Sequence, residues 1–555
     1  DGGEGIDIAL LEDSATGQIV DTRAIQNVEF IGLSAADDTV ILDQTNDYVM
    51  DGGAGWDVLD GSTASGLNIT LDETVTDTKS IVNFEEVIGS GYSDTILGNN
   101  QDDMISAGAG NDSVSGNAGD DTIRGESGDD ALSGQAGSDS LFGGGGQDTL
   151  AGGEGNDTLY FDAEDHLIDG GSDEDRAVLT GSDPGMAIES DRFQNIEHIE
   201  LGSADDTFKI YSDNDYTLDG KEGADLLDGS DSTSGLTLEL SDTQSGDTYI
   251  TGFDQITGSS FDDDFTGNSN ANILSGNAGQ DILRGEGGSD QLHGGIGSDS
   301  LYGGADDDSL HFDADDQIVS GGSGTDWAYL TDSSPGQAIR SDKIIEVEHI
   351  ELSTADDVFQ IFADNTYTLD GQGGNDQLDG SLSDQGLNLT LSDTKSGTNY
   401  IYGFDDAVGS NYADNLTGNS SANTIDGGDG NDILSGGLGD DVLSGGEGDD
   451  TIYGQQGIDT LSGGGGDDTL VFQSGDSSIA GGTGTDTAVL GDTYPDAIID
   501  SAKFSSIEHF ELGNQDERFK LYSSNDYSIA AGTGHDLIDG SDATSALNIT
   551  LSDSA

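Results

Sequence analysis

Eight consecutive nonapeptides fill residues 89–160 and read GSGYSDTIL, GNNQDDMIS, AGAGNDSVS, GNAGDDTIR, GESGDDALS, GQAGSDSLF, GGGGQDTLA and GGEGNDTLY. Their shared pattern is Gly-Gly-x-Gly-x-Asp-x-(Leu/Ile/Val)-x. Glycine permits the positive φ angles of a tight loop, and the Asp-x-apolar-x half reads as a very short strand with one inward side chain. A short fixed period of this kind predicts a solenoid in which each nonapeptide forms half a turn.

Two further arrays keep the same pattern, with six nonapeptides at 258–311 and seven at 409–471. Related spacers of 97 residues separate them, at 161–257 and 312–408. The array starts lie 169 residues apart (89 to 258) and then 151 apart (258 to 409), and the difference of 18 is two nonapeptides. The arrays therefore vary in whole half-turns, as expected where a fractional insertion would flip the inward face.

This periodicity predicts seven segments along the chain. They are a partial β-rich spacer (1–88), array 1 (89–160), a spacer (161–257), array 2 (258–311), a spacer (312–408), array 3 (409–471) and a partial spacer (472–555). In the spacers, Leu67, Ile69 and Leu71 alternate with polar residues, as in a half-buried strand. We expect the spacers to be either a wider solenoid that continues the arrays or a small sandwich.

The composition excludes several classes of protein. Asp and Glu number 112 against 14 Lys and Arg, for a formal net charge of −98, and there is no Cys. Such a chain lacks the basic patch of a nucleic-acid binder and is repelled by anionic lipid surfaces. No apolar run approaches the roughly 20 residues of a membrane span, and disulfides and thiolate metal sites are excluded. We therefore expect neither a nucleic-acid partner nor membrane insertion.

A folded chain this acidic needs countercharge from outside, and a divalent cation is the simplest source. Stacked loops would place one carboxylate in every turn, surrounded by backbone carbonyls. An all-oxygen ligand set of flexible number selects Ca²⁺ over thiol- or imidazole-seeking metals and over octahedral Mg²⁺. The predicted ligands are the sixth-position residues Asp94, Asp103, Asp112, Asp121, Asp130, Asp139, Asp148, Asp157, Asp263, Asp281, Asp290, Asp299, Asp308, Asp414, Asp432, Asp441, Asp450, Asp459 and Asp468.

Loop-like pieces of the spacers add a second group of predicted calcium ligands. They occur in segments such as DGGAGWDVLDGS (51–62) and SGGSGTDWAYL (320–330). Two array positions depart from the pattern, because the neutral residues Asn272 and Asn423 stand where the others have Asp. We expect these two to mark weaker sites or caps at the start of an array. The second group comprises Asp57, Asp225, Asp376, Asp536, Asp326 and Asp486.

At this level the sequence resembles the RTX family of hemolysin-type calcium-binding repeats. GGEGDDTIY (445–453) and GGGGDDTLV (463–471) are close to its consensus, and NFEEVIGS (83–90), GFDQITGS (252–259) and GFDDAVGS (403–410) resemble its lead-in to an array. The resemblance implies an all-β fold of parallel β-roll arrays alternating with β-rich spacers in an elongated repeat architecture. It implies Ca²⁺ between successive turns, held by the sixth-position Asp residues and by loop carbonyls such as those of Gly445 and Glu447. It also implies type I secretion and folding outside the cell.

Catalytic signatures are weak beside this pattern. His198, His349 and His509 recur in related contexts, but Phe30 takes the same place in the first copy, so packing is the favoured interpretation. The sequence contains no G-x-S-x-G, H-E-x-x-H or P-loop motif. An enzyme normally carries one site, whereas this chain repeats its features about three times, so we expect no enzymatic activity.

The leading hypothesis is a secreted, extracellular or cell-surface structural protein that calcium folds and stiffens. It would serve as an adhesin extender, a surface-layer component or a matrix filament. Its expected partners are calcium, further copies of itself in a layer or filament, or surface glycans. The alternative is the non-catalytic RTX region of a type I-secreted lipase, protease or polysaccharide epimerase whose catalytic domain lies elsewhere.

Overall fold

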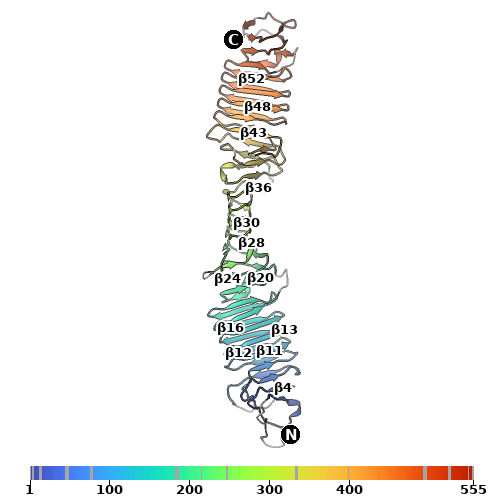
Figure 1. Cartoon of the computed structure of the whole chain (residues 1–555), viewed down its shortest axis with the longest axis vertical. Helices are drawn as coiled ribbons and strands as arrows, with labels where there is room; N and C mark the ends of the chain where they lie inside the picture. Colours follow the sequence, from blue (N-terminus) through green and yellow to red (C-terminus); the bar gives the residue numbers. More distant parts are fainter. Residues whose placement is uncertain are drawn as a thin grey trace. The chain divides into compact units, whose positions relative to one another are not determined.

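Parallel β-strands make up nearly all of the regular structure. The structure is a computed structural model that describes the chain except for residues 1, 3–5, 12–15, 44–48, 76–78, 182–186, 214–215, 246–247, 332–334, 365, 398, 492–496, 523–526, 548 and 553–555. It divides into two compact units, Asp1–Leu274 and Ser275–Ala555. Within each unit short strands stack on one another as a β-solenoid (Figure 1). The predicted all-β class and β-roll are confirmed.

Array 1 forms two sheets that share one core. One sheet contains β11 (Met104–Ala109), β13 (Thr122–Ser127), β15 (Ser140–Gly145) and β17 (Thr158–Phe161), and the other β10 (Thr95–Leu97), β12 (Ser113–Ala118), β14 (Ala131–Ala136) and β16 (Thr149–Glu154). Paired residues lie 18 apart, as in Ile105 with Ile123 and Val114 with Leu132. Each nonapeptide is therefore half a turn, as its period predicts.

Array 3 and the part of array 2 that follows residue 274 repeat this arrangement in the second unit. Array 2 includes β31 (Ile282–Gly287) and β33 (Ser300–Ala305) on one side and β32 (Gln291–Gly297) and β34 (Ser309–Phe312) on the other. The strands β35 (Ile318–Ser323) and β36 (Trp327–Leu330) continue these two sheets into the spacer. Array 3 includes β46 (Asn415–Thr417), β48 (Ile433–Leu438), β50 (Thr451–Gln456) and β52 (Thr469–Phe472) opposite β47 (Thr424–Asp429), β49 (Val442–Glu447) and β51 (Thr460–Gly465). The strand β53 (Ser478–Thr483) continues the sheet of β51 into the last spacer.

The core of each array is a single file of apolar side chains per sheet. Every nonapeptide supplies its eighth residue, such as Ile123, Leu141 or Leu443, and these residues are at most 3 % exposed. Burying one of them stabilises the fold by about 1.5–3 kcal/mol. Because only one such residue serves nine, the arrays have thin cores.

The spacers continue the solenoid with longer turns rather than forming a sandwich. In the first unit, β19 (Arg176–Leu179), β22 (His198–Glu200), β24 (Thr217–Asp219) and β27 (Ile250–Thr251) extend the sheet of β17. A second sheet begins with β20 (Ala187–Glu189), β23 (Thr207–Lys209), β25 (Asp225–Asp228) and β28 (Phe253–Thr257). Buried phenylalanines such as Phe161, Phe208 and Phe253 fill these wider turns.

Helix is confined, within the described residues, to four 3-10 turns. They are η1 (Thr22–Ala24), η2 (Ser190–Arg192), η3 (Ser341–Lys343) and η4 (Ser501–Lys503). The residue after η2, Phe193, packs edge-on against Phe161, and the residue after η4, Phe504, packs in the same way against Phe472. None of the helices in the described part of the chain is long and apolar enough to cross a membrane.

Candidate metal-binding rows

The sixth-position aspartates form vertical rows inside the fold. All nineteen predicted array residues are at most 3 % exposed, so their carboxylates are removed from water. In most residues inside the arrays one oxygen, Oδ1, accepts a hydrogen bond from the backbone N–H of the sixth-position residue one turn earlier. Examples are Asp94 N to Asp112 Oδ1 (2.7 Å), Asp112 N to Asp130 Oδ1 (2.8 Å) and Asp432 N to Asp450 Oδ1 (2.8 Å). These bonds tie successive turns together.

In eleven of these carboxylates the other oxygen, Oδ2, is buried and accepts no hydrogen bond from the described residues. A buried carboxylate without a compensating partner is costly, so each such atom calls for a cation or a proton. The array residues in this state include Asp112, Asp121, Asp130, Asp139, Asp157, Asp308, Asp432, Asp441, Asp450, Asp459 and Asp468. Asp148, Asp281, Asp290 and Asp299 are buried to the same extent.

The glycine that begins all but one of the nonapeptides leaves room beside that oxygen, and Ala107 begins the remaining one. A Cβ atom on Gly445 would lie 2.2 Å from Asp450 Oδ2 and 2.6 Å from the carbonyl oxygen of Gly463, one turn further on. Gly125 has the same surroundings, with Asp130 Oδ2 at 2.3 Å and the Gly143 carbonyl oxygen at 2.5 Å from such an atom. A carboxylate oxygen and a carbonyl oxygen of the next turn thus converge on one small space. These two oxygen atoms fit Ca²⁺, which prefers several oxygen ligands.

Burial also changes how these carboxyls titrate. Desolvation raises the pKa of Asp121, Asp157 and Asp432 to about 7 and that of Asp130 and Asp450 to about 6, and neighbouring carboxylates add to the increase. Hydrogen bonds from the backbone oppose the shift without cancelling it. A bound cation would favour the charged form of each carboxylate, so ligand binding and deprotonation are coupled.

At the start of each array, the Asp carboxylates have hydrogen-bond partners for both oxygens. Asp94 Oδ2 accepts from the backbone N–H of Ser90 (2.6 Å), and Asp103 Oδ2 accepts from that of Asn99 (2.8 Å). Asp263 and Asp414 accept from Ser259 and Ser410 in the same manner. Both oxygens of these four predicted ligands therefore have partners within the fold, unlike those of the residues further along the arrays.

Asn423 shows what a neutral side chain does in the same place. Its Oδ1 accepts from the backbone N–H of Asn419 (2.9 Å), while its Nδ2 donates to the carbonyl of Asp405 (2.9 Å). The Oδ1 atom of Asn423 thus takes the place that Oδ2 has in Asp103, and the amide Nδ2 takes the place of the other carboxylate oxygen. Asn272 is equally buried and accepts from the N–H of Asn268. That these two residues mark weaker sites or caps at the start of an array stays a prediction.

The spacer aspartates extend the rows. Asp57, Asp225, Asp326, Asp376 and Asp486 are fully buried, and the Oδ2 atom of each lacks a hydrogen-bond partner in the described part of the chain. Asp536 is only half-buried and accepts from the N–H of Glu517 (3.0 Å).

Asp175 belongs to these rows although it is not among the predicted ligands. Asp175 is fully buried, accepts from Asp157 N (2.8 Å) and has the same unpartnered Oδ2 within the described residues. Its loop carries Asp173, at φ 85°, where the related loop of Asp326 carries Gly324. Alignment of the spacer copies would have found it, because the preceding Gly170-Gly171 pair is retained.

Glutamates end several rows. Glu197 Oε2 accepts from the N–H of Asp175 (2.9 Å), and Glu348 and Glu508 do the same for Asp326 and Asp486. These glutamates directly precede the recurring histidines. The His198 and His349 rings hydrogen-bond through Nδ1 to Thr217 and Thr368 on the next turn, at 2.7 and 2.6 Å.

A second, exposed row at position five was not predicted. Asp102 Oδ1 accepts from the N–H of Asp120 (2.8 Å), and Asp120 Oδ1 accepts from the N–H of Ser138 (2.8 Å). Asp449 and Asp467 continue the same pattern in array 3. These bonds run in the opposite direction to those of the buried row, and they explain why Asp and Asn are frequent at this position.

Side chains alone do not assemble a metal centre. Within the described residues, no group of three or more His, Cys, Asp or Glu side chains is placed to hold a metal ion. An ion in the rows would therefore take few carboxylates and complete its coordination with backbone carbonyls, as the convergence at Gly445 and Gly125 indicates.

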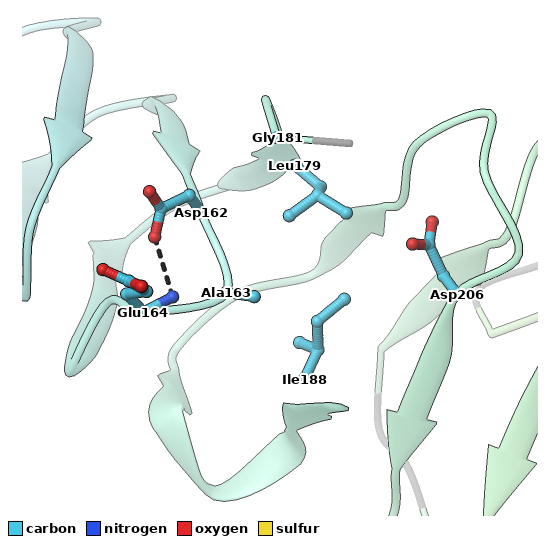
Figure 2. Close-up of a pocket in the computed structure, with 7 residues that line it drawn as sticks. All are labelled: Asp162, Ala163, Glu164, Leu179, Gly181, Ile188 and Asp206. Carbon is cyan, nitrogen blue, oxygen red and sulfur yellow. Dashed lines mark hydrogen bonds between the residues drawn. The ribbon is translucent and has the colours of Figure 1, made fainter. Parts of the chain in front are cut away.

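A pocket of about 160 Å³ lies beside the turn that ends array 1 (Figure 2). Asp162, Glu164 and Asp206 line it together with Leu179 and Ile188. Its volume is below the roughly 300–1,000 Å³ typical of small-molecule sites. None of the predicted calcium ligands lines it.

Comparison with known families agrees with the location of these rows. A family model described as the RTX calcium-binding nonapeptide repeat (four copies) matches residues 88–123, 124–159, 250–283, 257–292, 284–316, 293–328, 368–384, 408–443 and 444–479. The matches fall on all three arrays and reach into the spacers. A comparison with curated proteins finds no match.

Proposed function

Because the chain is built around RTX calcium-binding nonapeptide repeats, we propose that it is a secreted structural protein of a bacterial cell surface or extracellular matrix, folded and stiffened by extracellular calcium. Its role would be that of an adhesin extender, a surface-layer component or a filament. Extracellular calcium modules of another class bind at about 10⁻⁴–10⁻³ M, which sets the range in which we expect a response.

The observation that carries this proposal is the set of buried aspartate rows. Their Oδ2 atoms face a carbonyl of the next turn and no donor, and the chain has only 14 Lys and Arg to balance 112 Asp and Glu. When bound, calcium supplies the positive charge that neutralises the carboxylates. The Asp side chains and the glycine carbonyls would hold it, and the backbone bonds to Oδ1 would fix each carboxylate for binding.

We further propose that this chain has a structural rather than a catalytic role. The rows recur in three arrays and in the spacers between them, so the chain presents many equivalent sites instead of one distinct centre. Such repetition supports mechanical reinforcement along the solenoid, because each turn contacts only its neighbours.

A calcium titration followed by far-UV circular dichroism tests the proposal, with Mg²⁺ as the control. We expect a cooperative gain of β signal with Ca²⁺ alone and many bound Ca²⁺ ions per chain by equilibrium dialysis. Light scattering that rises with the β signal would favour a self-assembling layer or filament over a monomeric extender. A folded protein that binds no stoichiometric Ca²⁺ would refute the proposal.

A further inference from the structure

Each array ends in a turn that differs from those before it. Within the arrays the N–H donor and its Asp acceptor lie 18 residues apart, but at the three ends they lie 17 apart. The bonds are Asp148 N to Asp165 Oδ1 (3.0 Å), Asp299 N to Asp316 Oδ1 (2.9 Å) and Asp459 N to Asp476 Oδ1 (3.2 Å). The short segments 162–165, 313–316 and 473–476 thus replace the glycine loop.

These three turns satisfy their own carboxylates. Asp165 Oδ2 accepts from the N–H of Asp162 (2.8 Å), Asp316 Oδ2 from that of Asp313 (3.0 Å) and Asp476 Oδ2 from that of Gln473 (2.7 Å). In the first turn, Asp162 Oδ1 also accepts from the N–H of Glu164 (2.7 Å), as Figure 2 shows. The second carboxylate oxygen, which receives no donor from the described residues in Asp112, Asp130 or Asp450, is therefore bonded to backbone here.

A basic side chain donates to the carbonyls of each short turn. Arg192 Nη1 donates to the carbonyls of Ala163 (2.6 Å) and Asp165 (2.9 Å). Lys343 Nζ donates to the carbonyl of Asp316. Lys503 Nζ donates to those of Ser474 (3.1 Å) and Gly475 (3.2 Å).

The three basic residues occupy equivalent places in the fold. Each is the last residue of a 3-10 turn, η2, η3 or η4, and each is half-buried. The next residue, Phe193, Ile344 or Phe504, pairs with the strand that follows the short turn. This pairing holds the cation over the turn independently of its charge.

We propose that Arg192, Lys343 and Lys503 are cations that the chain itself supplies to the last turn of each array, so that this turn folds without calcium. The observation behind the proposal is the threefold coincidence of a shortened turn, a satisfied carboxylate and a cation on the carbonyls. A chain with 14 Lys and Arg places three of them in this one position. Each of these last turns would offer a preformed edge to which calcium-loaded turns add.

The proposal rests on calcium filling the rows of the arrays, but its first test needs no calcium. Hydrogen exchange followed by mass spectrometry on the full chain in EDTA should show protected amides at 161–168 beside rapidly exchanging amides in array 1. Exchange at 161–168 as fast as in the array would overturn the proposal. Failure of the proposed function, seen as no calcium binding, would leave this protection intact, so the two outcomes are distinguishable.

Variants of Arg192 separate the effect of its charge from the effect of its packing. Arg192→Met keeps most of the side chain and removes the charged donor; we expect it to abolish protection at 161–168 in EDTA and to raise the calcium midpoint of array 1 about tenfold. Arg192→Lys should retain both the protection in EDTA and the calcium midpoint, because Lys343 and Lys503 take the same place at the other two turns. Lys209→Met, which removes a surface pair with Asp231, should change neither.

Unchanged protection in Arg192→Met, or loss of protection in Arg192→Lys equal to that in Arg192→Met, would contradict the proposal. If Arg192→Met fails to fold even with calcium, Lys503→Met provides the same comparison at 472–478. Protection there that is insensitive to Lys503→Met would also overturn the proposal.

Discussion

Asp450→Asn should change the stability of array 3 in opposite directions with and without calcium. Asp450 is 1 % exposed, and its Oδ2 has no donor in the described part of the chain, while its Oδ1 accepts from the N–H of Asp432. An Asn keeps that acceptor and replaces the second oxygen with a donor close to the Gly463 carbonyl.

The magnitude follows from the pKa of Asp450, which burial raises to about 6 from 3.8. The Asp450 carboxyl holds its proton more tightly in the folded state than in the unfolded state. Its contribution to folding stability is therefore fully present below about pH 4, where the group is protonated in both states. The contribution is lost as the pH rises through about 6. At pH 7.5 the buried charge then costs up to about 3 kcal/mol. The Asn variant removes this cost in EDTA but also removes an anionic ligand when calcium is present.

The assay is hydrogen exchange of peptides within 445–471, in EDTA and in saturating calcium at pH 7.5. We expect Asp450→Asn to exchange more slowly than the wild type in EDTA and to need more calcium for full protection. Asp449→Asn is the matched control, because Asn431 occupies the same exposed position one turn earlier and already accepts from Asp449 N. Equal weakening by Asp450→Asn in both buffers, or the same behaviour in Asp449→Asn, would refute the reasoning.

Three further predictions test the rows and the core. In EDTA the protein should melt at a higher temperature at pH 5 than at pH 7.5. Burial raises the pKa of Asp121, Asp157 and Asp432 to about 7, so the contribution of these groups to folding stability is lost as the pH rises from about 4 to about 7. A higher melting temperature at pH 7.5 in EDTA would contradict this. Gly445→Ala should lower calcium affinity, since its Cβ would lie 2.2 Å from Asp450 Oδ2, whereas Gly373→Ala, with nothing within 4 Å, should not alter a calcium titration. Leu443→Ala should destabilise array 3 by about 2–5 kcal/mol in urea unfolding with calcium, against about 0.5 kcal/mol for the 47 % exposed Val442→Ala; similar costs for the two would argue against the single-file core.

The period of nine accounts for most of what the sequence could predict. One apolar residue at a constant place, as in Ile123, Leu141 and Leu443, requires a repeating inward face, and whole-unit variation in array length requires that face to be preserved. The half-turn and the parallel β-roll follow from these local features. The acidic rows follow as well, because stacking residues of one register necessarily aligns Asp112 with Asp130 and Asp432 with Asp450.

Only the tertiary structure decided which carboxylates remain unsatisfied. Asp103 and Asp121 have the same place in the nonapeptide, yet only Asp103 receives the N–H of a residue four positions earlier on its second oxygen. Asp175 joins the row although its loop lost a glycine, and Arg192 reaches a turn 27 residues away. The solenoid form of the spacers was also decided only by the tertiary structure. The spacer turns vary in length, so their strands can be identified only from the strands with which they pair. Periodicity describes what each turn contains, whereas the satisfaction of a buried oxygen depends on which donor the neighbouring turns bring within about 3 Å.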